Sequence, residues 1–75
     1  MSDTEDVPIR EGGIRLGQLL KFVGVADSGA DAAAIIAAGD VQVDGEVETR
    51  RGRQLDRGAV VEVAAPGGTQ RFRVI

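Results

Sequence analysis

Cysteine, histidine, tryptophan and tyrosine are all missing from this 75-residue sequence. Without cysteine the chain has no disulfide, no thiolate metal ligand and no thiol nucleophile. Without histidine it lacks the commonest general base and metal ligand. No nucleophile–base pair and no glycine-rich phosphate loop of the Walker type is recognisable. The sequence therefore indicates a protein that is not an enzyme and that carries no cofactor.

Carboxylates are the remaining side chains that commonly bind metals. Asp44, Glu46 and Glu48 alternate along one short segment and could together hold a metal ion. An exposed strand face accounts for the same alternation without any ligand. We therefore predict no metal site.

Long apolar runs are absent as well. No run approaches the ~18 apolar residues of a membrane span. Residues 1–6 are acidic, unlike the start of a signal peptide. A chain this short also has no room for a large internal substrate cavity. We expect a cytoplasmic protein with no membrane contact and no small-molecule substrate.

Charge is unevenly distributed along the chain, although the net charge is only −3. Residues 1–48 carry three basic and ten acidic side chains, whereas residues 49–75 carry six and two. This asymmetry favours one localised surface that faces an anion over a generally basic protein.

Two helices are predicted in the first half of the chain. A first helix is expected over residues 14–23, with an inward stripe at helical spacing formed by Leu16, Leu19, Leu20 and Val23. A second helix is expected to follow Ser28 as its N-cap and to end at Gly39. Because the connection is short, the two helices should form an antiparallel pair.

Beyond Gly39 the apolar residues recur at every second position, which predicts strands. The fold class is therefore α+β: two antiparallel helices packed on a small, mostly antiparallel sheet of three to five short strands. A hairpin is expected around Asp44-Gly45. A two-residue loop would place Val43 opposite Glu46, and a three-residue loop would place it opposite Val47. We favour the longer loop because it keeps both valines on one face.

One domain is expected over residues 14–75, preceded by an acidic N-terminal tail over residues 1–13. Within this tail, residues 7–10 alternate apolar and other side chains. They are compatible either with a short strand, which Pro8 would confine to a sheet edge, or with a continuation of the tail.

The helix–helix–hairpin order, with these residues, resembles the S4-type RNA-binding domain and its alpha-L motif. The resemblance covers about residues 14–63 and rests on Ile14-Arg15-Leu16, Leu19-Leu20, Gly24, Ser28, Ala32, Ile35-Ile36, Gly39 and Val41-x-Val43-Asp44-Gly45. Residues 14–21 and 45–53 are most similar to the small stand-alone bacterial proteins of the YbcJ-like type. The resemblance implies a non-enzymatic protein that recognises structured RNA, ribosomal RNA among the candidates, through backbone and shape contacts.

The site implied by this resemblance is a set of basic side chains and one helix start: Arg15, Lys21, Ser28, Arg50, Arg51 and Arg53. Three arginines within residues 50–53 can grip phosphates through paired N–H donors. The competing interpretation is a solvated loop whose charge is balanced by Glu46 and Glu48. For Ser28 the competing interpretation is a plain N-cap.

Two departures from the family pattern keep a second function open. Many members carry Arg where this chain has Gly29, and the YbcJ-like proteins usually carry Lys where it has Ala33. Both changes reduce the positive charge of the second helix. The alternative is a protein-interaction adaptor with weak or lost RNA binding, and an exposed apolar patch on the second helix would favour it.

Two further expectations concern single features. Phe22 is expected in the core or at its rim, with a platform for stacking an RNA base as the alternative. The acidic tail is either a solubilising segment or a competitor of RNA for the arginine loop.

Overall fold

The computed structural model describes residues 4–10 and 12–75. Its elements, in chain order, are β1 (Thr4–Val7), β2 (Ile14–Arg15), α1 (Leu16–Phe22), α2 (Gly29–Ala37), β3 (Val41–Val43), β4 (Glu46–Val47), β5 (Gln54–Leu55), β6 (Val60–Ala65) and β7 (Gly68–Val74). Neither helix of these described residues is long and apolar enough to cross a bilayer.

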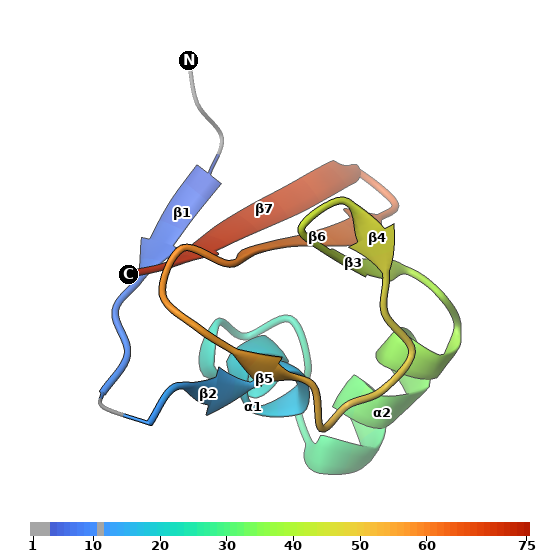
Figure 1. The fold of residues 1–75 in the computed structure, drawn as a ribbon. Coiled ribbons are helices and arrows are strands. Elements are labelled where there is room, and N and C mark those ends of the chain that lie inside the picture. The colour runs from blue at the N-terminus through green and yellow to red at the C-terminus, as the bar shows by residue number, and fades with distance from the viewer. Residues whose placement is uncertain (1–3, 11) are drawn as a thin grey trace.

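Five strands form the main sheet, in the order β1-β7-β6-β3-β4, and β2 with β5 form a second, two-stranded sheet. Every pairing is antiparallel except that of β1 with β7. Both helices lie on one side of the main sheet (Figure 1). The predicted α+β class, with two helices on a mostly antiparallel sheet, is confirmed.

The core lies between the helices and the inner face of the sheet. The sheet contributes alternate residues, namely Val7, Val41, Val43, Val61, Val63, Phe72 and Val74, and the helices contribute chiefly Leu16, Leu19, Leu20, Ala32 and Ile36. Each large side chain buried in this way stabilises the fold by about 1.5–3 kcal/mol. Arg71 and Arg73 alternate with the inward residues of β7 and stay exposed, as the period of two requires.

The first helix starts two residues later than predicted. Residues 14 and 15 form β2 instead, with Ile14 opposite Leu55. Gly13, at φ +77°, permits this pairing, because a Cβ there would lie 2.6 Å from the Leu55 carbonyl oxygen. The short apolar stretch around Leu55 gives residues 14–15 a strand partner, which sequence periodicity alone does not reveal.

The hairpin loop has two residues, so the predicted three-residue loop is wrong. Val43 pairs with Glu46, and Asp44 and Gly45 both have positive φ, at 51° and 87°. That geometry matches the right-handed twist of the flanking strands. The Asp44 side chain also accepts the Val60 N–H at 3.0 Å, which ties the turn to β6. Turn geometry thus sets the register, and Val47 is left 57% exposed.

The N-terminal strand lies earlier than residues 7–10, where a short strand was one of two interpretations. It spans Thr4–Val7 and pairs with β7, and Val7 is only 1% exposed. Residues 4–7, predicted to be mostly tail, are therefore part of the sheet. β1 and β4 are the two opposite edges of this sheet. Competition of the acidic tail with RNA for the arginine loop stays a prediction. The rest of the tail prediction, for residues 1–3 and 11, lies outside the described residues.

Candidate nucleic-acid interface

Basic side chains from two distant segments line one shallow pocket of about 230 Å³. Its lining, called the basic pocket below, consists of Arg15, Gly17, Gln18, Lys21, Gly29, Arg51 and Gly52. No ion pair within the described residues involves Arg15, Lys21 or Arg51. Three exposed cations therefore converge on a small area of a protein that is acidic overall.

The arginine loop reaches this position because it is bonded to the start of α1. The Leu16 N–H donates to the Arg53 carbonyl and the Gly17 N–H to the Arg51 carbonyl, both at 2.9 Å. These bonds satisfy two N–H groups that a helix start leaves without partners. A Cβ at Gly17 would lie 3.4 Å from the Arg51 carbonyl oxygen. A glycine inside this helix is thus explained by the close approach of the loop.

The buried carboxylate of Glu48 holds the arginine loop, residues 50–53, through hydrogen bonds and ion pairs. The two-residue hairpin turns Val47 outward and Glu48 inward, where the Glu48 N–H donates to the Val41 carbonyl at 3.0 Å. The residue is only 8% exposed. Its carboxylate accepts bonds from Arg50 Nε and Nη2, both at 3.2 Å, and from Arg53 Nη1 at 3.0 Å. Two of the three loop arginines therefore share one buried counter-charge.

These bonds also set the protonation of the group. The Arg50 guanidinium, hydrogen-bonded to Glu48, lowers the pKa of this carboxyl from 4.5 to about 2, against an opposing effect of burial and with a further contribution from Arg53. The same bond raises the pKa of Arg50. The ion pair is therefore fully formed at neutral pH.

A pH dependence of stability follows from the lowered pKa of Glu48. A group with a depressed pKa in the folded state stabilises fully above its unfolded value of 4.5, and this contribution is lost as the pH falls toward about 2. In urea unfolding across this range, the wild type should lose its advantage over Glu48→Gln progressively. Glu46→Gln, which changes an exposed neighbour, should track the wild type. A constant gap between wild type and Glu48→Gln from neutral pH to about pH 2 would contradict the assignment.

The predicted site residues thus fall into two groups. Arg15, Lys21 and Arg51 surround the basic pocket, whereas Arg50 and Arg53 hold Glu48 beside it. The sequence analysis considered that carboxylates balance the positive charge of the arginine loop, and this is confirmed for Glu48. Sequence reasoning missed the inward turn of Glu48, which follows from the hairpin register.

Ser28 acts as the N-cap of α2, since its Oγ accepts the Asp31 N–H at 3.1 Å. The Asp31 carboxylate accepts the Asp27 N–H at 3.0 Å, one residue before the cap. Gly29, not Ser28, lines the basic pocket. The missing side chain at Gly29, which removes a family arginine, leaves the first turn of α2 open to the pocket.

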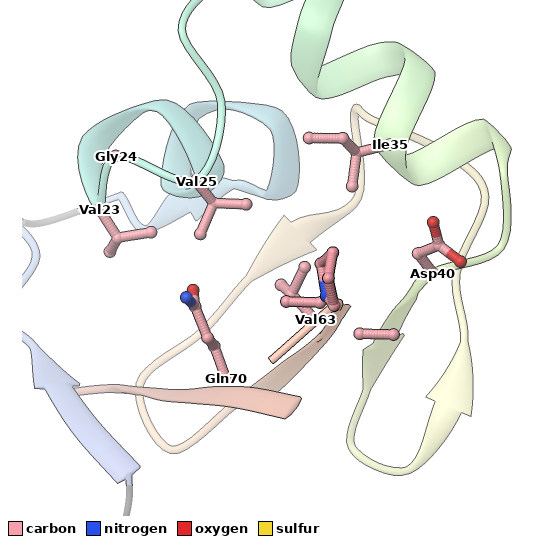
Figure 2. A pocket seen from close by; sticks show the side chains of 10 residues that line it. Val23, Gly24, Val25, Ile35, Asp40, Val63 and Gln70 are labelled. Atoms are coloured by element: carbon pink, nitrogen blue, oxygen red, sulfur yellow. The ribbon is translucent and has the colours of Figure 1, made fainter. Parts of the chain in front are cut away.

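A second hollow, of about 410 Å³, lies between the connection that follows α1 and the sheet (Figure 2). Its lining combines hydrophobic side chains, Val23, Val25, Ile35 and Val63 among them, with polar groups that include the carboxylate of Asp40. Asp40 is the one charged residue among the described residues of this lining, and it would repel a phosphate. This hollow is therefore a poor place for a nucleic-acid backbone.

The carboxylates considered for a metal do not converge. Asp44 bonds to the start of β6, and Glu48 faces two arginines. Within residues 4–10 and 12–75 no group of three or more His, Cys, Asp or Glu side chains could hold a metal ion.

An exposed apolar patch on α2 would have favoured the adaptor function, but the exposed surface of α2 consists mostly of small side chains. The exposed residues of α2 are mostly alanines, namely Ala30, Ala34 and Ala37. The large exposed hydrophobic residues in the described part of the chain are Phe22, Val47 and Ile75, and none of them lies on α2. Phe22 itself was expected near the core, and this prediction is wrong, because the side chain is 67% exposed.

Comparison with known proteins agrees with the fold. The S4 domain family matches residues 7–74. The putative RNA-binding protein YbcJ of Escherichia coli is 45% identical over 51 residues, covering 68% of this chain and 73% of YbcJ. The solution structure of YbcJ, described as revealing an alpha-L motif involved in RNA binding, superimposes with a TM-score of 0.62 at 34% identity. That similarity covers 95% of this chain and 86% of YbcJ.

Two further relatives match most of this chain. The probable ribosome maturation protein RlbA of Bacillus subtilis is 42% identical over 57 residues, covering 76% of this chain and 80% of RlbA. The tyrosine–tRNA ligase of Thiobacillus denitrificans is 40% identical over 62 residues, covering 83% of this chain. The chain spans only 15% of that ligase.

Proposed function

Since this chain belongs to the S4 domain family, an RNA-binding domain and not an enzyme class, we propose that it binds structured RNA through the basic pocket. The observation that carries the proposal is the convergence of Arg15, Lys21 and Arg51, none of which has an ion-pair partner in the described residues. Cations without an ion-pair partner are free to neutralise backbone phosphates.

Arg50 and Arg53 extend the proposed surface beyond the pocket. Their bonds to Glu48 hold two guanidinium groups in a fixed orientation, and the Arg50 side chain remains 73% exposed. The N–H groups that do not face Glu48 can still donate to phosphates. In this proposal Glu48 positions donors, and the pocket cations supply most of the charge.

Recognition is proposed to depend on RNA shape and backbone. Double-stranded RNA is recognised largely through phosphates and 2′-hydroxyls across its shallow minor groove. The net charge of −3 limits non-specific attraction, so contact must be made at the pocket. Ribosomal RNA is the partner that we propose, and the resemblance to RlbA, named a probable ribosome maturation protein, supports it. A ribosomal protein is the second proposed partner, in contact with this chain on the same RNA. This function would place the protein in the cytoplasm.

The proposal is tested by titrating the protein with a fluorescent RNA stem-loop over a series of salt concentrations. With about three phosphate contacts, the logarithm of the binding constant should fall against that of salt with a slope of about −2 to −3. A DNA stem-loop of the same sequence should bind more weakly, because it lacks the 2′-hydroxyls. Absence of RNA binding even at about 20 mM salt would overturn the proposal.

The ribosomal assignment needs its own comparison. Ribosomal and transfer RNA fractions should compete for the labelled complex with different strength, and the ribosomal fraction is expected to compete more strongly per nucleotide. Stronger competition by transfer RNA would keep the RNA-binding function and refute the ribosomal partner.

A further inference from the structure

An apolar hollow of about 540 Å³ borders the basic pocket. It is lined by Pro8, Ile9, Arg10, Gly13, Ile14, Gln18 and Phe22. Gln18 lines both this hollow and the basic pocket, so the two are adjacent. The volume lies within the range of about 300–1,000 Å³ that is usual for sites of small ligands.

Phe22 is the feature of this hollow that most needs an explanation. It follows Gln18 by four residues, so both lie on the outward face of α1. A large aromatic side chain that is 67% exposed keeps considerable apolar area in contact with water. The chain has only one other aromatic residue, Phe72, and that residue is buried in the sheet. Phe22 is therefore the single aromatic surface available for stacking.

The polar groups around Phe22 suit a nucleotide. Gln18 Oε1 accepts the Arg15 N–H at 3.0 Å, which orients the side-chain amide and leaves its NH₂ group to donate elsewhere. The Arg10 guanidinium is exposed and has no ion pair with any described residue. None of the described residues that line the hollow is acidic. The occupant should thus combine a flat apolar surface with a negative charge.

We propose that this hollow binds one unpaired nucleobase of the RNA held by the basic pocket, with the base stacked on Phe22 and its phosphate near Arg10. The inference rests on the proposed function and adds a preference that phosphate contacts cannot supply. Stacking on an aromatic side chain is favourable for every base, because each base has a π-face. The protein should therefore prefer RNA with a bulged or looped nucleotide to a perfect duplex, with little preference for base identity.

The test uses two RNA probes: a stem with one unpaired 2-aminopurine, whose fluorescence reports stacking, and the fully paired duplex of the same length. Phe22→Leu keeps apolar volume but removes the ring, and Phe22→Trp keeps a stacking surface. Because Phe22 is exposed, both variants should fold as the wild type does. Val47→Leu, at another exposed apolar position, is the matched control.

Wild type and Phe22→Trp should bind the bulged probe more tightly than the duplex. Phe22→Leu should lose about 5- to 100-fold in affinity for the bulged probe, with its affinity for the duplex and its salt slope unchanged. If Phe22→Leu binds both probes as the wild type does, the stacking site is refuted while RNA binding stands. If the wild type binds neither probe, the proposed function fails and this inference fails with it. If the free wild type sediments as a dimer and Phe22→Leu as a monomer, a second copy covers the hollow and the nucleobase proposal is overturned.

Discussion

Replacing Arg15, Lys21 and Arg51 together with alanine is expected to weaken binding of a structured RNA by about 100-fold. Each lost phosphate contact should cost roughly 1 kcal/mol of binding free energy. The three costs add, so the corresponding factors multiply in the binding constant. The plot of the logarithm of the binding constant against that of salt should also become shallower by about 2 to 3. The reason is that the phosphates that these cations would neutralise keep their counterions. The three side chains are exposed, so the fold should be unaffected.

A matched control is available on the outer face of the sheet. Arg71 and Arg73 are exposed on β7, and their replacement with alanine changes the net charge by the same amount as Arg15→Ala combined with Arg51→Ala. Arg71 donates to Glu62, away from the basic pocket. This control should lose only the small affinity that general charge provides. Equal losses in the two double variants would show that binding depends on net charge and not on the pocket.

The second large effect concerns stability. Val7→Asp should remove most of the free energy of unfolding, because it places a carboxylate at a position that is 1% exposed. Burying an unpaired charge and losing a core side chain together cost about 4 kcal/mol or more. A domain of this size has only about 4–11 kcal/mol to lose. Urea unfolding followed by circular dichroism measures the change, and a fall of about 15 °C or more in melting temperature should accompany it.

Asp6→Ala is the control for this variant. Asp6 is the exposed neighbour on the same strand, so its replacement should change stability by about 0.5 kcal/mol or less. If Val7→Asp were as stable as Asp6→Ala, residues 4–7 would not be part of the folded sheet. The acidic tail first expected from the sequence would then be the better description.

The periodicity of apolar residues correctly predicted which face of a single helix or strand is buried. The leucines of α1 recur at helical spacing and are fully buried, and the alternation in β7 separates Phe72 and Val74 from its arginines. The basic side chains proposed for the site were also singled out in advance, because their charge is evident without a structure, and their role in binding stays a prediction. What the sequence did not reveal was which of them come together.

The missed features all depend on contacts between distant segments. β2 exists because residues 14–15 pair with residues 54–55, and β1 because it pairs with the last strand of the chain. The hairpin register was wrongly predicted because the hydrophobic match of Val43 with Val47 favours one loop and the twist of the strands favours the other. That register turns Glu48 inward and so decides which arginines are paired. Phe22 was misplaced because an aromatic residue next to an apolar stripe is usually buried.

The central claim is that RNA contacts the basic pocket, and an NMR titration with an RNA stem-loop at low salt tests it most directly. The backbone amides of Arg15, Gly17, Gly29 and Arg51 should show the largest chemical-shift changes. Those of Arg71 and Arg73, on the outer face of the sheet, should stay nearly unchanged. Shifts concentrated on β7, or around the hollow that contains Asp40, would contradict the account, because RNA would then bind a different face of the protein.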